Sequence, residues 1–361
     1  MPPTAGWGDH ITSAQMKWLD PFAIGDDGAL LGHGRPSQRI RDFPGAVPLL
    51  EAIFADVADA VGAPLHFDEV EIWTPRQLQR HFHQPKDSTR QFWGFVSQLP
   101  GREPIMVLND QVLASMSRLA AGELPANSDE RLSFLFQLRV ALIVAVHEAL
   151  HSVGPSDPVQ WAQATAQYPL TAPITEGLTE LATSRILSSA LRHLPIRCEL
   201  PATLPIDVVQ RLGADSPVSI LPTPGKTNRV PLPYPVEAAV AEGFVTAFDQ
   251  MLKRGASSPS RGFDGTLREL LLDRATLSAL QHVARDVLGP GHDGEEEVEH
   301  LAENIRTAWM TSIDAEQPAF DGLLSGVRDP VRIHAALDAI SARAAATARR
   351  VIASEMAPLA V

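Results

Sequence analysis

One predicted helix constrains this chain more than any other feature. It begins at Ser128, a residue type that often caps helices, and Gly154 marks its end. The residues between them are apolar on nearly every side, which is typical of a helix buried in a protein core. Near its end, however, the helix carries His147, Glu148 and His151. Burying a glutamate and two histidines is costly unless another group compensates, so these residues need an explanation of their own.

The spacing of these residues is that of a metal site on a helix. Two histidines four residues apart project from one helix face about one turn apart, so His147 and His151 can bind one ion. Glu148 can reach a water on that ion and accept its proton. The sequence therefore predicts a Zn²⁺ site with two histidine ligands and Glu148 as the general base.

A catalytic zinc usually takes three protein ligands and keeps one position for water. Two residues compete for the third position. Glu176 lies four residues before Glu180 on the next predicted helix, at about 175–194, so one carboxylate can bind zinc while the other accepts a hydrogen bond from a ligand histidine. Asp157 completes the alternative pattern HExxHxxGxxD, but it also has a structural role as the cap before Pro158. We therefore favour Glu176 and keep Asp157 as the alternative.

These motifs resemble those of the zincin metallopeptidases, over about residues 100–195. In the gluzincin branch, a second helix supplies the third ligand. The pair Glu176-Gly177, with Glu180 four residues after Glu176, is similar to the pattern of that helix. Asp157 would instead resemble the metzincin pattern, with aspartate in place of the third histidine. That branch also has a methionine turn, which the downstream methionines in their helix-like contexts do not obviously supply (Met251, Met310 and Met356).

The resemblance implies a zinc-dependent metallopeptidase with an α+β, zincin-like fold, in which a small mixed or antiparallel sheet packs on the HExxH helix. His147, His151 and Glu176 would hold Zn²⁺, which polarises the scissile carbonyl and activates a water. Glu148 would take the proton from that water and deliver it to the leaving amine. Tyr234 is a candidate for stabilising the oxyanion, although packing at a helix start is the simpler interpretation. A zinc hydrolase of a small amide and a non-catalytic binding protein stay open as alternatives.

The sequence as a whole predicts four parts: an irregular N-terminal arm (1–45), a zincin-like catalytic domain (46–195), a proline-rich connector (196–235) and a mainly helical C-terminal region (236–361). Helices are predicted at 48–61, with Gly62 just past the end, and at about 110–121. Alternating apolar residues predict a strand near 65–72 and a hairpin whose strands lie at 92–97 and 105–108. If the last strand edges the cleft, it could pair with an extended peptide.

Composition limits the partners. The 30 Lys and Arg residues against 43 Asp and Glu residues give a net charge of -13, which repels phosphate backbones, so we expect no nucleic-acid partner. The resemblance to the zincins implies a peptide or protein substrate instead. The single cysteine, Cys198, excludes an intramolecular disulfide and a cysteine-based zinc cluster. The most apolar stretch, 140–146, is far shorter than the roughly 20 residues of a membrane span, and residues 1–20 lack the apolar run of a secretory signal. We therefore expect a cytoplasmic protein with no membrane partner, and the sequence does not indicate an oligomeric state.

Overall fold

The computed structural model describes most of the 361-residue chain, namely residues 43, 45–67, 69–81, 94–97, 105–123, 125–153, 168, 170–187, 234–253, 262–273, 276–289, 294–326 and 329–356. Contacts divide these residues into two compact units. The sheet unit contains the described residues from 43 to 153 together with 183–187, and the helical unit contains those at 168–182 and 234–356. The predicted arm and connector lie outside the described residues except at their ends, so the four-part division stays a prediction.

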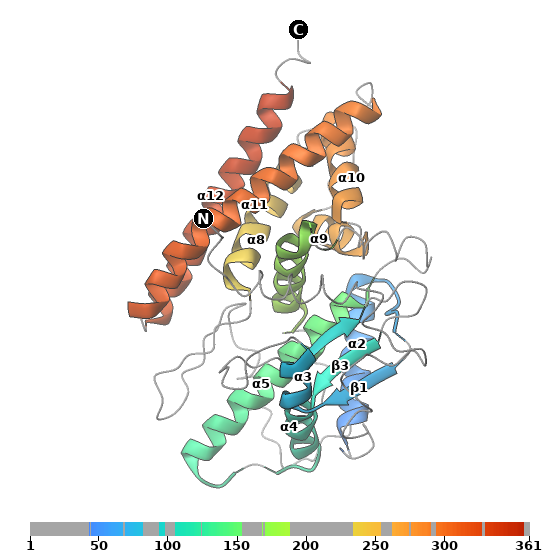
Figure 1. Cartoon of the computed structure of the whole chain (residues 1–361), viewed down its shortest axis with the longest axis vertical. Coiled ribbons are helices and arrows are strands. Elements are labelled where there is room, and N and C mark those ends of the chain that lie inside the picture. The colour runs from blue at the N-terminus through green and yellow to red at the C-terminus, as the bar shows by residue number, and fades with distance from the viewer. Residues whose placement is uncertain are drawn as a thin grey trace. The chain divides into compact units, whose positions relative to one another are not determined.

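The sheet unit contains a three-stranded mixed sheet in the order β1-β3-β2 (Figure 1). β1 (Glu69–Trp73) runs parallel to β3 (Ile105–Asn109), and β2 (Gly94–Ser97) runs antiparallel to β3. The hairpin expected from 92–97 and 105–108 is confirmed as a strand pair. The second of these strands is not an edge, however, because β3 pairs on both sides. Its run of consecutive buried residues is typical of a strand covered on both faces, so the idea that it pairs with a peptide is wrong.

Helix ends in the sheet unit follow the capping residues of the sequence. α2 (Ala46–Val61) ends at Gly62, whose φ of 63° is the left-handed conformation that favours glycine. α4 (Asp110–Ala120) begins after Asn109, whose side-chain oxygen accepts a hydrogen bond of 2.9 Å from the backbone N–H of Gln111. Both predicted helices are confirmed within a few residues.

The long apolar helix is buried, as its sequence predicts. α5 (Ser128–His151) has every residue from 141 to 150 buried. It packs against α2, α4 and β2. A second apolar cluster joins the sheet to the short helix α3 (Pro75–His81), and its buried members are Trp73, Leu78, Phe95 and Val107. This packing fixes β2, the strand that contacts α5.

A further helix covers residues 170–187 and begins earlier than the predicted start at 175. Tyr168 is helical as well, and Pro173 lies within the helix rather than before it. The predicted end near residue 194 lies outside the described residues.

The described C-terminal part is helical, as predicted, and consists of α8 (Pro235–Leu252), α9 (Gly262–Leu272), α10 (Thr276–Leu288), α11 (Glu295–Gly326) and α12 (Pro330–Met356). α8 packs closely on α12. A Cβ at Gly243 would lie 2.3 Å from the carbonyl oxygen of Ser341, so this close approach requires glycine. The rings of Phe244 and Trp309 stack with centroids 4.5 Å apart and connect α8 to α11.

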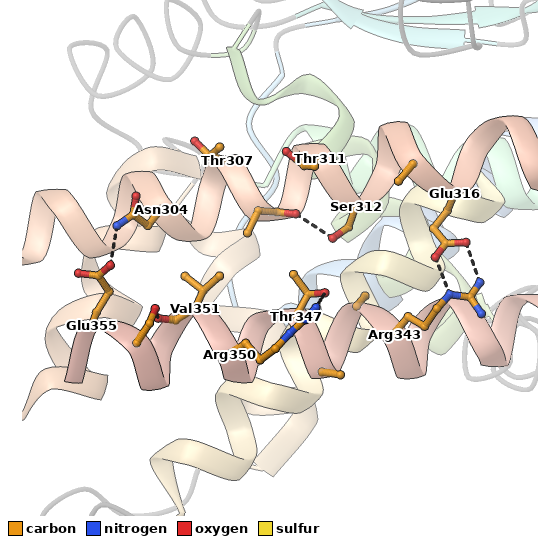
Figure 2. A pocket seen from close by; sticks show the side chains of 15 residues that line it. Asn304, Thr307, Thr311, Ser312, Glu316, Arg343, Thr347, Arg350, Val351 and Glu355 are labelled. Carbon is orange, nitrogen blue, oxygen red and sulfur yellow. Dashed lines mark hydrogen bonds and ion pairs between the residues drawn. The ribbon is translucent and has the colours of Figure 1, made fainter. Parts of the chain in front are cut away.

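α11 and α12 run antiparallel and are joined near both ends of a shared groove (Figure 2). The guanidinium of Arg343 donates two hydrogen bonds of 2.6 Å to Glu316, and the amide of Asn304 donates one of 2.9 Å to Glu355. Between these pairs lies a pocket of about 920 Å³ lined mainly by Ala, Ser and Thr. No charged residue that lines it is buried. The pocket therefore lacks the desolvated charged groups that are typical of a catalytic site.

The described residues are thus mainly helical with one small mixed sheet, which confirms the α+β class. No helix among them is both long enough and apolar enough to cross a membrane.

Candidate metal centre

The end of α5 is held by contacts from a neighbouring segment. The backbone N–H of His66 donates a hydrogen bond of 2.8 Å to the carbonyl oxygen of Ser152, and Leu65 forms an antiparallel bridge with Val153. The hydroxyl of Ser152 also donates a hydrogen bond of 2.6 Å to the carbonyl oxygen of Ala149. These contacts fix the C-terminal end of the helix, where the two histidines lie one turn apart.

The two histidine side chains converge. His147 and His151 are both buried, their Nε2 atoms lie 3.0 Å apart, and their ring centroids lie 4.7 Å apart. A tetrahedral zinc with two nitrogen ligands at their usual distance would hold those nitrogens about 3.3 Å apart. The histidine pair is therefore already close to the arrangement that a single ion requires.

Glu148 lies beside the edge strand of the sheet. Its side chain is buried, and a Cβ built on Gly94 of β2 would lie 3.0 Å from Glu148 Cγ and 3.1 Å from Glu148 Oε1. The same Cβ would lie 3.0 Å from the carbonyl oxygen of Val107. Glycine at this position lets the strand backbone pass close to the predicted general base, because a Cβ there would make tighter than usual contacts with it. A glycine inside a predicted strand was the available signal for such an approach.

Glu176 belongs to the helix at 170–187, where its side chain is 3% exposed. The phenol of Tyr168 donates a hydrogen bond to Glu176 Oε1. The neighbouring Thr175 hydroxyl donates one of 3.2 Å to the carbonyl oxygen of Thr171. Glu180, one turn further along, is also buried, and its predicted hydrogen bond to a ligand histidine stays a prediction.

The structure brings His147, His151 and Glu176 together as a possible metal-binding group. Each offers one ligand atom, these atoms all lie within 4.8 Å of one another, and all three side chains are buried. Two imidazole nitrogens and one carboxylate oxygen form a donor set that catalytic zinc takes in proteins. A cation would also compensate the burial of a carboxylate away from water. The residues present therefore fit a zinc ion.

Near Glu176 lies a further buried carboxyl, that of Glu237. Burial is the main cause that raises the pKa of Glu237, on α8, to about 8, and the negative charges of Glu176, Asp321 and Glu180 add to it. The backbone of α8 lies directly against this region, since a Cβ at Gly177 would lie 2.5 Å from the carbonyl oxygen of Glu237. Glu237 was not predicted as a site residue, although a glutamate among the apolar residues at the start of α8 was a usable signal.

The other predicted site residues have different outcomes. Asp157 and Cys198 lie outside the described residues, so the alternative third ligand remains open. Tyr234 occupies the N-cap position of α8 and is buried, and its role in stabilising an oxyanion stays a prediction. The three methionines considered for a methionine turn all lie within helices (Met251, Met310 and Met356).

Comparison with protein-family models, curated proteins and solved structures gave no match. Only the residues of the candidate metal centre themselves therefore indicate its function.

Proposed function

We propose that this chain is a zinc-dependent hydrolase of the gluzincin type that cleaves peptide bonds. His147, His151 and Glu176 would hold the zinc ion. The observation that carries the proposal is the group of three buried donor atoms within 4.8 Å of one another. Next to the first histidine in sequence stands a buried glutamate, which supplies the base that hydrolysis requires.

Glu148 is suited to act as this base. Adjacent helix residues point about 100° apart, so Glu148 faces away from His147 and does not share its ligand position. Bound zinc would polarise the scissile carbonyl and lower the pKa of a water. Glu148 would accept a proton from this water and pass it to the nitrogen of the leaving amine. Its burial keeps bulk water from competing for the carboxylate.

The edge strand favours a peptide over a small amide as the substrate. Within the described sheet, β2 pairs with β3 on one side only, and Gly94 brings the β2 backbone against Glu148. An extended peptide can add to such an edge through backbone hydrogen bonds. A peptide paired with β2 would pass beside the base. The role first suggested for the strand at 105–108 therefore belongs to β2 in this proposal.

Replacing Glu148 by glutamine tests the proposal. The variant keeps the shape of the side chain and removes the base, so turnover should fall by about 10²–10⁴-fold while zinc content stays the same. Cleavage of a mixed peptide library can be followed by mass spectrometry at equal zinc loading. Glu130→Gln is a matched control, since Glu130 is an exposed residue in the first turn of the same helix.

The outcomes separate the candidate functions. Loss of cleavage in Glu148→Gln but not in Glu130→Gln supports the peptidase. Equal cleavage by Glu148→Gln and the wild type contradicts the role of Glu148. Absence of cleavage by zinc-loaded wild type would favour the small-amide hydrolase or the non-catalytic binding protein.

A further inference from the structure

Tyr168 makes a contact that the proposed reaction does not use. Its phenol donates a hydrogen bond to Oε1 of Glu176, from a position eight residues earlier in the chain. The tyrosine is half-buried and the carboxylate is buried. Hydrogen bonds to an ionised carboxylate are roughly twice as strong as neutral ones, so this contact restrains the rotation of the carboxylate.

The contact distinguishes the two oxygens of Glu176. A carboxylate that binds a metal ion through both oxygens uses Oε1 as a ligand, so the hydrogen bond from the phenol to Oε1 disfavours that mode and favours binding through Oε2 alone. A carboxylate that binds through one oxygen gives a site of three protein ligands with the two histidines, and the fourth tetrahedral position stays open for water. A carboxylate that binds through both oxygens would crowd that position.

We propose that Tyr168 is a positioning residue, whose phenol makes Glu176 a ligand through one oxygen and so keeps the water position open. This inference rests on the proposed zinc centre. In this proposal Tyr168 contacts neither the substrate nor the metal, because the effect of its phenol passes through Glu176. Hydrogen-bond partners of metal ligands commonly act in this way, by orienting the ligand.

Tyr168→Phe removes the hydroxyl and keeps the ring. We expect this variant to bind zinc about 10–100-fold more weakly than the wild type, as measured by competition with a chromophoric chelator. Loaded with Co²⁺, the variant should show weaker visible absorption, because a carboxylate that binds through two oxygens raises the coordination number. Thr175→Val is the control, since it deletes a hydroxyl from the adjacent residue whose partner is a backbone carbonyl. It should keep the affinity and the Co²⁺ spectrum of the wild type, and thermal unfolding of the metal-free variants checks their folding.

The results distinguish this inference from the function on which it rests. Unchanged or tighter zinc binding by Tyr168→Phe, with an unchanged Co²⁺ spectrum, would overturn the positioning role and leave the zinc centre standing. Equal weakening in Thr175→Val would also overturn it, because the effect would then belong to the helix. Failure of folded wild type to bind either ion would overturn the zinc centre and this inference together.

Discussion

Glu237 should give the metal-free protein a stability that falls as pH rises. Burial and neighbouring negative charge raise the pKa of this carboxyl from 4.5 to about 8. Below pH 4.5 the group is protonated in both the folded and the unfolded chain, so it contributes no difference. Above that pH the unfolded chain releases the proton while the folded chain retains it, and the free energy of unfolding therefore decreases.

The size of the effect follows from the pKa. Each pH unit between the two pKa values is worth about 1.4 kcal/mol, so the loss reaches about 3 kcal/mol at neutral pH. It approaches about 5 kcal/mol near pH 8 and then levels off, because both states are ionised above that pH. Such a loss is a large part of the roughly 5–15 kcal/mol that stabilises a typical domain.

Glu237→Gln removes this titration, and Glu242→Gln is the control, because Glu242 is a half-buried glutamate on the same helix. Urea unfolding followed by circular dichroism, with a chelator present, should be measured from about pH 5 to about pH 8. We expect the wild type and Glu242→Gln to lose stability over this range. The loss for Glu237→Gln should be smaller than theirs by at least about 3 kcal/mol. Parallel curves for Glu237→Gln and the wild type would refute the reasoning.

Three other substitutions test separate parts of the account. Gly94→Ala should place a methyl 3.0 Å from Glu148 Cγ and lower peptide turnover by up to about 10²-fold, with zinc content unchanged. Full activity of this variant would contradict the close approach of β2. Asn109→Ala should cost about 1 kcal/mol in urea unfolding through loss of the α4 cap, and an unchanged midpoint would contradict that role. Gly243→Ala should cost about 1–3 kcal/mol, because its Cβ would lie 2.3 Å from the carbonyl oxygen of Ser341, and a neutral result would show that α8 and α12 adjust freely.

The features that sequence predicted well are local. The α2 and α4 ends follow Gly62 and Asn109, whose effects act within one helical turn. The burial of α5 follows from apolar residues on every side of one helix. The convergence of His147 and His151 follows from helix geometry alone, since residues four apart share a face.

The features that sequence missed depend on contacts between distant segments. The central position of β3 reflects pairing with two separate strands, although its run of apolar residues was a usable signal. The approach of β2 to Glu148 depends on how the sheet packs on α5, and Gly94 was the only local sign of it. The hydrogen bond from Tyr168 to Glu176 had no sequence signal, because no motif marks a contact between two side chains eight residues apart.

Zinc content after reconstitution tests the central claim most directly. Elemental analysis of the folded, desalted wild type should give about one zinc per chain. Glu176→Ala should lose most of that zinc, whereas Asp157→Ala should retain it and lose only about 1 kcal/mol of stability as a helix cap. The account is contradicted if folded wild type retains less than about a tenth of an equivalent, or if Asp157→Ala loses the zinc that Glu176→Ala keeps.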